Sequence, residues 1–342
     1  MKQPSLVSII ILSYNSLRYI EKCMAAVLQQ DYLNWEALIV LNGSTDGSAE
    51  FIKTRYRRFK KIRILEPGEN LWFCRGNNYG IAHASGEYVL ALNQDTVMEP
   101  DFISLLVQAM ETDPSLGSVS GKLLYYNFEI DSKTKILDST GLEIFKTRRV
   151  IDRGQWEQDF GQYDQDTEIF GASGAAAFYR RSALEAVKLP TADGKFEYFD
   201  EDFIAYKDDI DISWRLLLAG YRCRYVPGAV VYHGRTIGRS WPSQVLNFIL
   251  NRHRQSRLIR KQSFKNHYLM MVKNELPRLF WRHLPYILGR ELLLFIYTLI
   301  FEQFQFFALL EFSRQLPEAR RKRQLIMAKV RGDPEALRQF FH

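Results

Sequence analysis

Carboxylates stand at two places in this 342-residue chain where their spacing suits chemistry. The first is the segment LNQDT, in which an apolar run ends at Asp95, two residues after the amide of Asn93. A divalent ion that bridges a pyrophosphate needs hard oxygen ligands at a fixed strand end, and one protein carboxylate with phosphate oxygens and water is usual for Mg²⁺ or Mn²⁺. We therefore expect Asp95 to be a metal ligand. Taken alone, an Asp after a strand is more often a turn former or a helix cap.

The second place is DEDFIAYKDDIDISWR, where Asp208, Asp209 and Asp211 crowd the start of a helix. Helix capping and the helix dipole explain one or two of these acids, but not three. Like charges so close together raise at least one pKa, which suits a general base that removes a proton from a hydroxyl group.

Two further segments carry weaker signals. His233 follows the apolar run Ala229–Tyr232, where an imidazole is either a hydrogen-bonded surface group or a ligand for a metal such as Mn²⁺. The segment Glu69–Gly80 (ENLWFCRGNNYG) reads as a Gly- and Asn-rich loop that approaches phosphate or ribose, with Arg75 as either a pyrophosphate-binding cation or a solvated side chain. It is neither GxGxxG nor a Walker loop, so NAD and ATP sites of those kinds are not indicated.

The elements that must position these residues alternate between strands and helices. We expect strands at Val7–Leu12, Trp35–Leu41, Ile62–Leu65 and Tyr88–Leu92, helices at Ile20–Gln29 and Ser48–Arg58, and a turn at Gly43–Gly47. Such alternation predicts a parallel sheet, whose ligands bind beyond the carboxyl ends of the strands. Tyr14, Asn42 and Asn93 fall at those ends.

Beyond the first sheet strands the pattern weakens and then returns. Residues 121–171 are polar and charged, which predicts connecting hairpins and a mobile loop outside the core. The stretch GASGAAAFYRRSAL predicts a strand followed by a helix, and Ile210–Ala219 an amphipathic helix that ends at Gly220.

After Trp241 the chain becomes helical and basic, and it is apolar over Leu284–Phe312. Within it, Leu292–Phe312 is about long enough to span a bilayer, but Glu302, Gln303 and Gln305 lie in its middle, where a charge costs about 2.5 to 3.5 kcal/mol. We therefore expect a helix that lies in the membrane interface, with the basic run Ala319–Arg323 attracting anionic lipids. The alternative is an ordinary pair of core helices with a solvated basic face.

Composition narrows the class of protein. The chain holds 46 Lys and Arg against 39 Asp and Glu, a net charge of +7, but no helix-turn-helix, zinc-finger or RNA-binding signature, so we expect no nucleic-acid partner. Cys23, Cys74 and Cys223 are too far apart for CxxC spacing, which favours a reducing cytoplasm. The first apolar run is too short for a signal peptide or a spanning helix.

Six motifs together resemble the family-2 glycosyltransferases of the GT-A fold, in particular the bacterial rhamnosyltransferase-like branch. In chain order they are VSIIILSYN, VLNGSTDGS, ENLWFCRGNNYGIAHASGEYVLALNQDT, GASGAAAFYRRSAL, FDEDFIAYKDDIDISWRLLLAGY and VVYHGRT, over about residues 7 to 240. The resemblance implies an α/β, Rossmann-like, mostly parallel sheet flanked by helices in residues 1–241. Residues 242–342 would form a helical, basic, membrane-associating region.

The resemblance also implies roles for residues. Asp209 would be the catalytic base, and Asp95 and His233 would bind Mg²⁺ or Mn²⁺. The donor side would comprise Tyr14, Asn15, Asn42, Arg75, Asn78 and Asn93, and the acceptor side Asp208, Asp211 and Trp214. The reaction would be an in-line displacement that inverts the anomeric centre without a covalent intermediate.

The partners implied are a nucleotide diphosphate sugar, best matched by dTDP-L-rhamnose, a glycan or lipid-linked acceptor, and the cytoplasmic, anionic face of the cell membrane. Leu41 stands where relatives often have Asp, and Trp72 and Arg75 replace small residues, so a UDP- or GDP-sugar is an alternative donor. A sugar nucleotidyltransferase would need a Gly-rich basic loop after the first strand, where this chain has SYNSLRYIEK. A non-catalytic scaffold would explain Leu41, but it would have no use for Asp95, Asp209 and His233 together.

Overall fold

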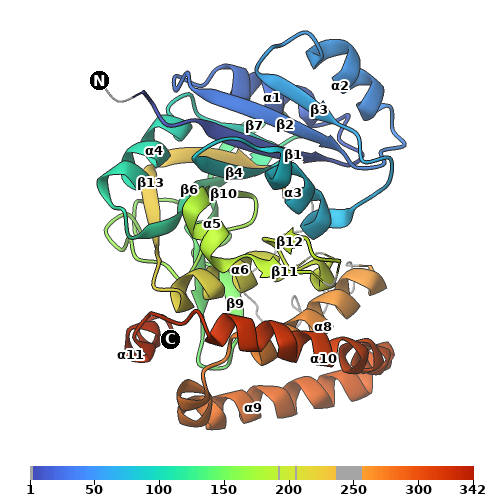
Figure 1. The fold of residues 1–342 in the computed structure, drawn as a ribbon, viewed down its shortest axis with the longest axis vertical. Coiled ribbons are helices and arrows are strands. Elements are labelled where there is room, and N and C mark those ends of the chain that lie inside the picture. Colours follow the sequence, from blue (N-terminus) through green and yellow to red (C-terminus); the bar gives the residue numbers. More distant parts are fainter. Residues whose placement is uncertain (1–2, 192, 205, 236–255) are drawn as a thin grey trace.

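The computed structural model describes residues 3–191, 193–204, 206–235 and 256–342 (Figure 1). Within them, the largest sheet has the strand order β3-β2-β1-β4-β10-β6-β13-β5, with β7 paired to β6. Its strands are β1 (Val7–Ser13), β2 (Trp35–Leu41), β3 (Ile62–Leu65), β4 (Tyr88–Asn93), β5 (Thr96–Met98), β6 (Leu116–Asn127), β7 (Ser132–Ser139), β10 (Ala176–Arg180) and β13 (Arg222–His233). Two short strand pairs lie outside it: β8 (Leu142–Ile144) with β9 (Val150–Asp152), and β11 (Leu189–Pro190) with β12 (Phe196–Glu197).

The N-terminal half of the sheet is parallel. β1 pairs with both β2 and β4, and β2 pairs with β3, all in the same direction. Their continuous apolar sequences follow from burial on both faces, because helices cover each side of the sheet. The four strands expected from the sequence are confirmed, with shifts of one residue at most.

The other half of the sheet is mixed, and here one expectation is wrong. β10 runs antiparallel to β4 and β6, and β13 runs parallel to β6. β6 is a buried central strand of 12 residues, although its second half belongs to the segment 121–171 that we placed outside the core. Polar residues such as Ser118, Ser120 and Lys122 interrupt the apolar pattern of this strand, although they are buried in the sheet. The hairpins β6–β7 and β8–β9 agree with the expectation for the rest of that segment.

The helices of the first 235 residues pack on this sheet. They are α1 (Ile20–Leu28), α2 (Ser48–Tyr56), α3 (Trp72–His83), α4 (Phe102–Thr112), α5 (Arg181–Val187), the 3₁₀ turn η1 (Glu201–Phe203) and α6 (Asp208–Leu218). α3 corrects the reading of Glu69–Gly80 as a loop, because all but its first three residues are helical. Gly76 and Gly80 serve packing there: a Cβ at either would lie 2.4 Å from Leu12 or Ile10 of β1.

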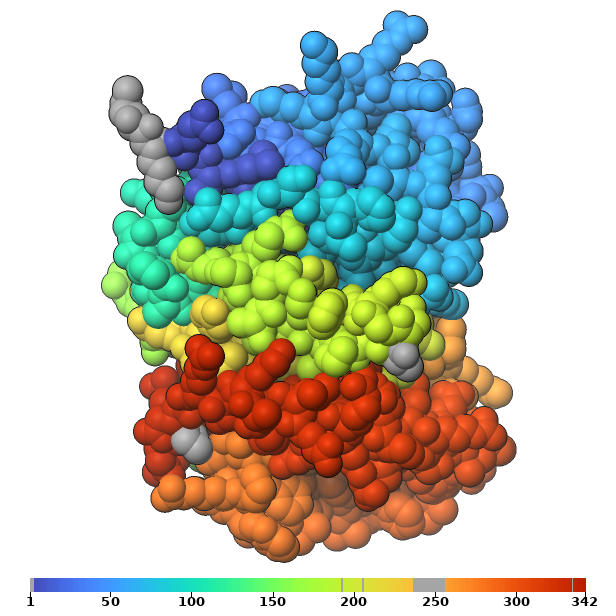
Figure 2. Space-filling view, in the orientation of Figure 1, coloured from blue at the N-terminus to red at the C-terminus, as the bar shows by residue number. Residues whose placement is uncertain are grey.

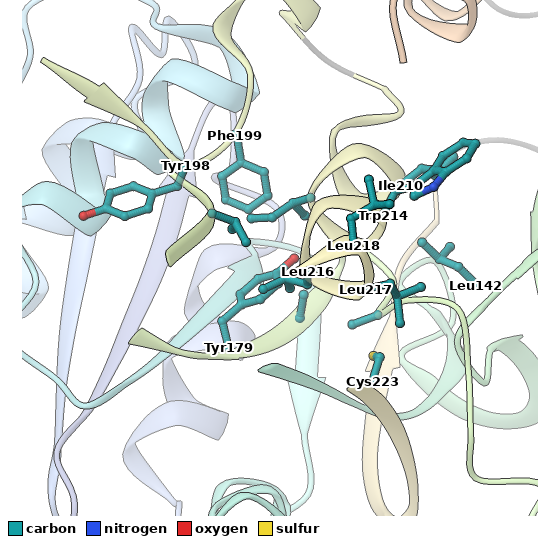
Figure 3. Packing of buried hydrophobic residues seen from close by; sticks show 14 of the residues in the cluster. Leu142, Tyr179, Tyr198, Phe199, Ile210, Trp214, Leu216, Leu217, Leu218 and Cys223 are labelled. Carbon is teal, nitrogen blue, oxygen red and sulfur yellow. The ribbon is translucent and has the colours of Figure 1, made fainter. Parts of the chain in front are cut away.

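Helix α6 runs through the centre of one hydrophobic core (Figure 3). Trp214 is 1% exposed and packs edge-on against Phe170 and Phe341. Gly171 permits the close approach of α6, because a Cβ at that position would lie 2.2 Å from the Ser213 hydroxyl. The core therefore fixes the helix on which the acidic segment begins.

The C-terminal helices form a block against α6 and the segment before it (Figures 1 and 2). They are α8 (Arg257–Asn274), α9 (Pro277–Phe301), the turn η2 (Gln303–Gln305), α10 (Phe306–Met327) and α11 (Pro334–Arg338). The expected domain boundary at residues 241 and 242 lies outside the described residues.

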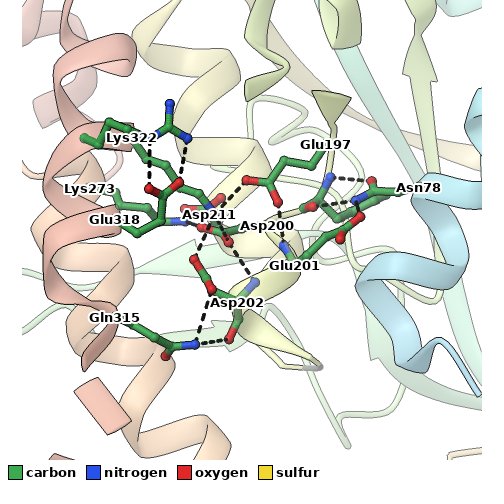
Figure 4. Close-up of polar contacts among 12 residues, drawn as sticks. Asn78, Glu197, Asp200, Glu201, Asp202, Asp211, Lys273, Gln315, Glu318 and Lys322 are labelled. Carbon is green, nitrogen blue, oxygen red and sulfur yellow. Dashed lines mark hydrogen bonds and ion pairs between the residues drawn. The ribbon is translucent and has the colours of Figure 1, made fainter. Parts of the chain in front are cut away.

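A set of charges, all but one of them buried, joins this block to α6 (Figure 4). We call it the anchor cluster, and it consists of Glu197, Asp200, Asp202, Asp211, Lys273 and Lys322. Lys273 of α8 pairs with Asp200 and lies 2.8 Å from the Asp211 carboxylate of α6. Lys322 of α10 lies 2.7 Å from the Glu197 carboxylate and 2.6 Å from that of Asp200. The helical block is thus fixed to the segment that leads into α6.

Candidate active site

The carboxyl ends of the parallel strands meet at one edge of the sheet, as the sequence predicts. Leu12 pairs with Asn93 and Ser13 with Leu41, so the chain leaves all three strands at the same level. Gln94 links two of these exits, because its side chain accepts a hydrogen bond from the Tyr14 N–H at 2.7 Å and donates one to the Tyr14 carbonyl at 2.8 Å. Tyr14 itself is 46% exposed at this edge.

Asp95 and His233, far apart in the sequence, lie side by side. β5 pairs antiparallel with the end of β13, with Thr96 opposite His233, and the Gly234 N–H donates to the Asp95 carbonyl at 2.8 Å. The His233 Nε2 atom lies 3.4 Å from the Asp95 carboxylate and 3.5 Å from the amide nitrogen of Asn93. Strand pairing therefore brings together the two predicted metal ligands.

The other ring nitrogen of His233, Nδ1, contacts a buried carboxylate. Nδ1 lies 2.8 Å from the carboxylate of Asp138, which is 1% exposed on β7. A carboxylate on one ring nitrogen fixes the orientation of the ring and directs the other nitrogen outward, which is the usual support of a metal-binding histidine. Burial lowers the pKa of His233, but the Asp95 and Asp138 carboxylates raise it to about 10.

This arrangement fits a divalent ion. A carboxylate oxygen and a directed imidazole nitrogen face each other, and the negative charges that hold a proton on His233 would equally favour a cation in its place. Among the described residues no three His, Cys, Asp or Glu side chains converge as a complete metal site. The protein would therefore supply two ligands and leave the remaining positions to phosphate oxygens and water.

Arg235 extends the cluster toward α6. Its guanidinium lies 2.7 Å from the Asp138 carboxylate and 2.7 Å from that of Asp152 on β9. Asp152 in turn is close enough to Asp209 for its negative charge to raise the pKa of Asp209. We call Asp95, Asp138, Asp152, Asp209, His233 and Arg235 the site cluster.

Asp209 is half-buried in the first turn of α6. Its carboxylate accepts hydrogen bonds from the Gly174 N–H at 3.2 Å and from the Ile210 N–H at 2.8 Å, which fix its orientation. Burial, and then the negative charge of Asp152, raise the pKa of Asp209. An oriented carboxylate with a raised pKa is suited to accept a proton from a hydroxyl group.

The backbone leading to Asp209 is strained. Ile204, Tyr206 and Lys207 all have positive φ values, between 60° and 70°, which side chains other than Gly rarely adopt. The Ile204 carbonyl accepts hydrogen bonds from the N–H groups of Phe73 and Cys74, at 3.1 and 3.2 Å, at the start of α3. Strain of this kind persists where surrounding contacts impose it, and it is common at functional sites.

Two residues expected on the acceptor side are placed elsewhere. Asp211 is 0% exposed, where Arg215 holds it at 3.0 Å and Asn274 at 2.7 Å, and Trp214 lies in the core. Neither side chain is exposed, so neither can contact an acceptor. The expectation that Asp211 and Trp214 line the acceptor side is therefore corrected. Asp208 is 5% exposed beside Asp209, and burial followed by the Asp209 charge raises its pKa well above the ordinary value.

Two of the expected donor-side amides are also used internally. The Asn42 side chain accepts from the Leu71 N–H at 2.6 Å and is buried. Asn78 donates to the Phe199 carbonyl at 2.8 Å, and its amide oxygen accepts from the N–H groups of Tyr198 and Phe199. These amides position α3 and the segment before η1, and that they also border the nucleotide stays a prediction.

The remaining donor-side residues stay at the surface of this edge. Asn15 has a positive φ of 46° and accepts from the Thr45 N–H at 2.8 Å, so it shapes the turn after β2. Arg75 is exposed on α3, with Glu69 at 3.4 Å and Glu201 at 3.8 Å. Both remain candidates for contact with a nucleotide.

Three members of the site cluster were missed in the sequence: Asp138, Asp152 and Arg235. Asp138 and Asp152 lie in the polar segment 121–171, where one carboxylate looks like any other. Arg235 did carry a signal, because it follows His233 by two residues and so leaves the same strand end.

Comparison with known proteins identifies relatives of the chain. A family model described as Glycosyl transferase family 2 matches residues 8–188, a little over half of the chain. Poly-beta-1,6-N-acetyl-D-glucosamine synthase of Staphylococcus epidermidis is 27% identical over 245 residues, which are 70% of this chain and 53% of that protein. The same enzyme of Staphylococcus aureus strain COL is 28% identical over 245 residues, again 70% and 53%. The chain thus spans about half the length of the curated relatives it matches.

Solved structures share the fold. S. aureus TarS 1-349 in complex with UDP-GlcNAc has a TM-score of 0.56 at 17% identity, covering 98% of this chain and 92% of that one. The mannosyltransferase PcManGT from Pyrobaculum calidifontis, in complex with GDP-Man and Mn²⁺, has a TM-score of 0.52 at 18% identity, covering 92% and 74%. At these identities the likeness concerns the fold alone, and it confirms the expected GT-A architecture.

Proposed function

The chain belongs to glycosyl transferase family 2, and we propose on that basis that it is a metal-dependent, inverting glycosyltransferase. It would move a sugar from a nucleotide diphosphate donor to a hydroxyl group of a glycan or lipid-linked acceptor in cell-surface polysaccharide synthesis. One observation carries this proposal: the Asp95–His233 pair is linked through Asp138 and Arg235 to Asp152, whose negative charge raises the pKa of the oriented Asp209 carboxylate.

Asp209 would act as the general base. Its carboxylate would take the proton of the acceptor hydroxyl while the hydroxyl oxygen attacks the anomeric carbon and the nucleoside diphosphate leaves from the opposite side. A single displacement of this kind inverts the anomeric centre and needs no nucleophile on the protein. The Gly174 and Ile210 N–H groups would hold the carboxylate in position throughout.

Asp95 and His233 would hold the divalent ion, Mg²⁺ or Mn²⁺. When bound, such an ion neutralises negative charge that develops on the leaving diphosphate. Asp138 would keep the His233 ring in its orientation, and Asn93 would border the same position from the end of β4. Tyr14, Asn15 and Arg75 are the exposed groups of this edge that we assign to donor contact.

The donor is proposed only as a nucleotide diphosphate sugar. The dTDP-L-rhamnose favoured by the sequence resemblance is not supported by the two complexes described above, which contain UDP-GlcNAc and GDP-Man. Reaction at the cytoplasmic face of the membrane remains our proposal for its location.

The direct test is a transfer assay with dTDP-, UDP- and GDP-sugars, using delipidated glycan and lipid-linked glycan fractions as acceptors. We expect acceptor-dependent release of one nucleoside diphosphate, abolished by EDTA and restored by Mn²⁺ or Mg²⁺, and a product of inverted anomeric configuration by NMR. Retained configuration would contradict the inverting reaction. No release from any donor class with either acceptor fraction would contradict transfer itself and leave the non-catalytic scaffold as the better account.

A further inference from the structure

Helix α9 presents a line of large apolar side chains to solvent. Trp281, Leu288, Leu292, Phe295 and Leu299 are between 51% and 68% exposed. Their spacings of seven, four, three and four residues place them along one side of an α-helix. By length and composition, α9 is the one helix in the described part of the chain that could cross a bilayer, with a mean hydropathy of 1.6 and only 11% of its most apolar window buried. An exposed apolar face of this size marks a contact with something else.

The opposite side of α9 is attached to the protein at points near its start, its middle and its end. Its buried residues are Leu279, His283, Ile287 and Thr298. Near the first turn, the guanidinium of Arg148 lies 3.0 Å from His283, and Arg148 also pairs with Glu275, just before the helix.

Two more polar attachments follow along the same helix. In its middle, Tyr268 of α8 donates to Glu291 at 2.6 Å, and Arg290 lies 2.8 Å from the His267 ring. At its end, Glu302 is 0% exposed and lies 2.8 Å from Arg260 of α8. Three attachments over this length hold the helix flat against the body, so crossing a bilayer would require all of them to break.

The charge of this region suits an anionic surface. Residues 256–342 hold 16 Lys and Arg against 7 Asp and Glu, whereas residues 1–255 hold 30 against 32. Arg282 of α9 and Arg314 and Arg320 of α10 are exposed. An apolar helix face in a region with an excess of basic side chains is the pattern of a helix that lies in the interface of an anionic membrane.

We propose that the outer face of α9 docks the protein on an anionic lipid bilayer, with the helix parallel to the membrane and its apolar line inserted among the acyl chains. A second copy of the chain fits this face less well, because two such basic regions would repel each other in a dimer. The inference specifies where a membrane contacts the molecule and does not depend on the reaction proposed above.

Flotation with lipid vesicles tests this docking. Wild-type protein should float with vesicles of equimolar phosphatidylcholine and phosphatidylglycerol, bind phosphatidylcholine alone more weakly, and lose part of its binding in high salt. The variant Leu288→Glu/Leu292→Glu should bind the anionic vesicles about tenfold more weakly or worse, because two inserted apolar side chains are replaced by anions. Both positions are exposed, so the variant should keep the wild-type melting temperature.

The matched control is Leu33→Glu/Ile130→Glu, which places two acids at exposed apolar positions outside the C-terminal helices. Leu33 is 75% and Ile130 is 71% exposed. We expect this control to bind like the wild type. Equal binding by the α9 variant and the control would overturn the proposal. So would a dimer without lipid for both the wild type and the control, with only the α9 variant monomeric. Retention of the wild type in cell membranes after carbonate extraction would overturn the flat orientation. No donor sugar is present in these experiments, so their failure would leave the proposed reaction untouched.

Discussion

Two clusters of charge flank helix α6, and they differ in what surrounds them. In the site cluster, Asp95, Asp209 and Arg235 keep part of their surface accessible, and Asp209 has an elevated pKa. In the anchor cluster, Asp200 and Asp211 are at most 2% exposed, and Lys273 contacts both. The first cluster is therefore open to a ligand, whereas the charges of the second are paired with one another and hold elements of the fold together.

The same short acidic segment supplies both clusters. Asp209 and Asp211 are two residues apart, which turns their side chains toward different sides of the helix. Asp209 meets backbone N–H groups and another carboxylate, while Asp211 meets Arg215, Asn274 and Lys273. The partners that the fold brings to each carboxylate therefore decide its role, since the residue type is the same.

The largest expected effect separates the two carboxylates by activity. Asp209→Asn should lower kcat by about 10² to 10⁴, because it removes a general base, while donor binding and the melting temperature are retained. Asp211→Asn should lower stability instead and leave kcat of the folded fraction unchanged. Initial rates of nucleoside diphosphate release, corrected for folded protein by circular dichroism, measure both. Equal kcat losses in the two variants would erase the distinction between the clusters.

The next effect concerns stability. Lys273→Ala should reduce the free energy of unfolding by about 3 to 5 kcal/mol, because it leaves the buried charges of Asp200 and Asp211 without this cation. Urea denaturation measures the loss. As a control, Lys53→Ala breaks an exposed pair with Glu66 and should cost less than about 1 kcal/mol. A Lys273 variant as stable as this control would show that the anchor cluster does not hold the helical block.

A third effect tests the support behind His233. Asp138→Ala should weaken Mn²⁺ binding in the presence of nucleoside diphosphate by about 10- to 100-fold, because the ring loses the carboxylate that orients it. Asp138→Asn keeps a hydrogen-bond acceptor and should recover part of the affinity. Calorimetric titration gives both values. Unchanged metal affinity in the Ala variant would remove Asp138 from the site.

The smallest effect lies in the pH dependence of stability. Burial, and then the Asp200 charge, raise the pKa of Glu197 in the anchor cluster to about 7 from its ordinary 4.5. The folded state then binds this proton more tightly than the unfolded state, so the contribution of Glu197 to stability is greatest below about pH 4.5 and is lost as the pH rises through about 7.

Glu197→Gln should therefore gain stability relative to the wild type between those two pH values. Melting temperatures of both proteins across that range provide the measurement. A constant difference between them would place the titration on another group.

The parts of the molecule that the sequence predicts are those set by local pattern. Apolar runs such as Val7–Leu12 identify the parallel strands, and strand ends locate Asp95 and His233, whose pairing through β5 and β13 then follows from the fold. Asp209 is likewise located by its position at the start of a helix.

The rest depends on contacts that span long stretches of sequence. Asp138 reaches His233 through the pairing of β6 with β7, and nothing in its neighbourhood distinguishes it from other acids in a polar segment. Asn78 shows the same dependence, because its hydrogen-bond partners on residues 198 and 199 lie far along the chain and nothing in its Gly- and Asn-rich segment indicates them. Burial of Asp211 and Trp214 could not be foreseen either, since it comes from α8 and from Phe341 near the C-terminus.

The most direct test of the central claim is a thermal-shift series with dTDP-, UDP- and GDP-sugars, each with and without Mn²⁺ or Mg²⁺, on the wild type and on His233→Ala. A ligand that binds only the folded state must raise the melting temperature. We predict that one nucleotide class raises it, that the rise requires the metal, and that the His233 variant loses the metal-dependent part. No rise with any donor, or the same metal-dependent rise in the variant, would contradict a nucleotide-sugar site built on Asp95 and His233.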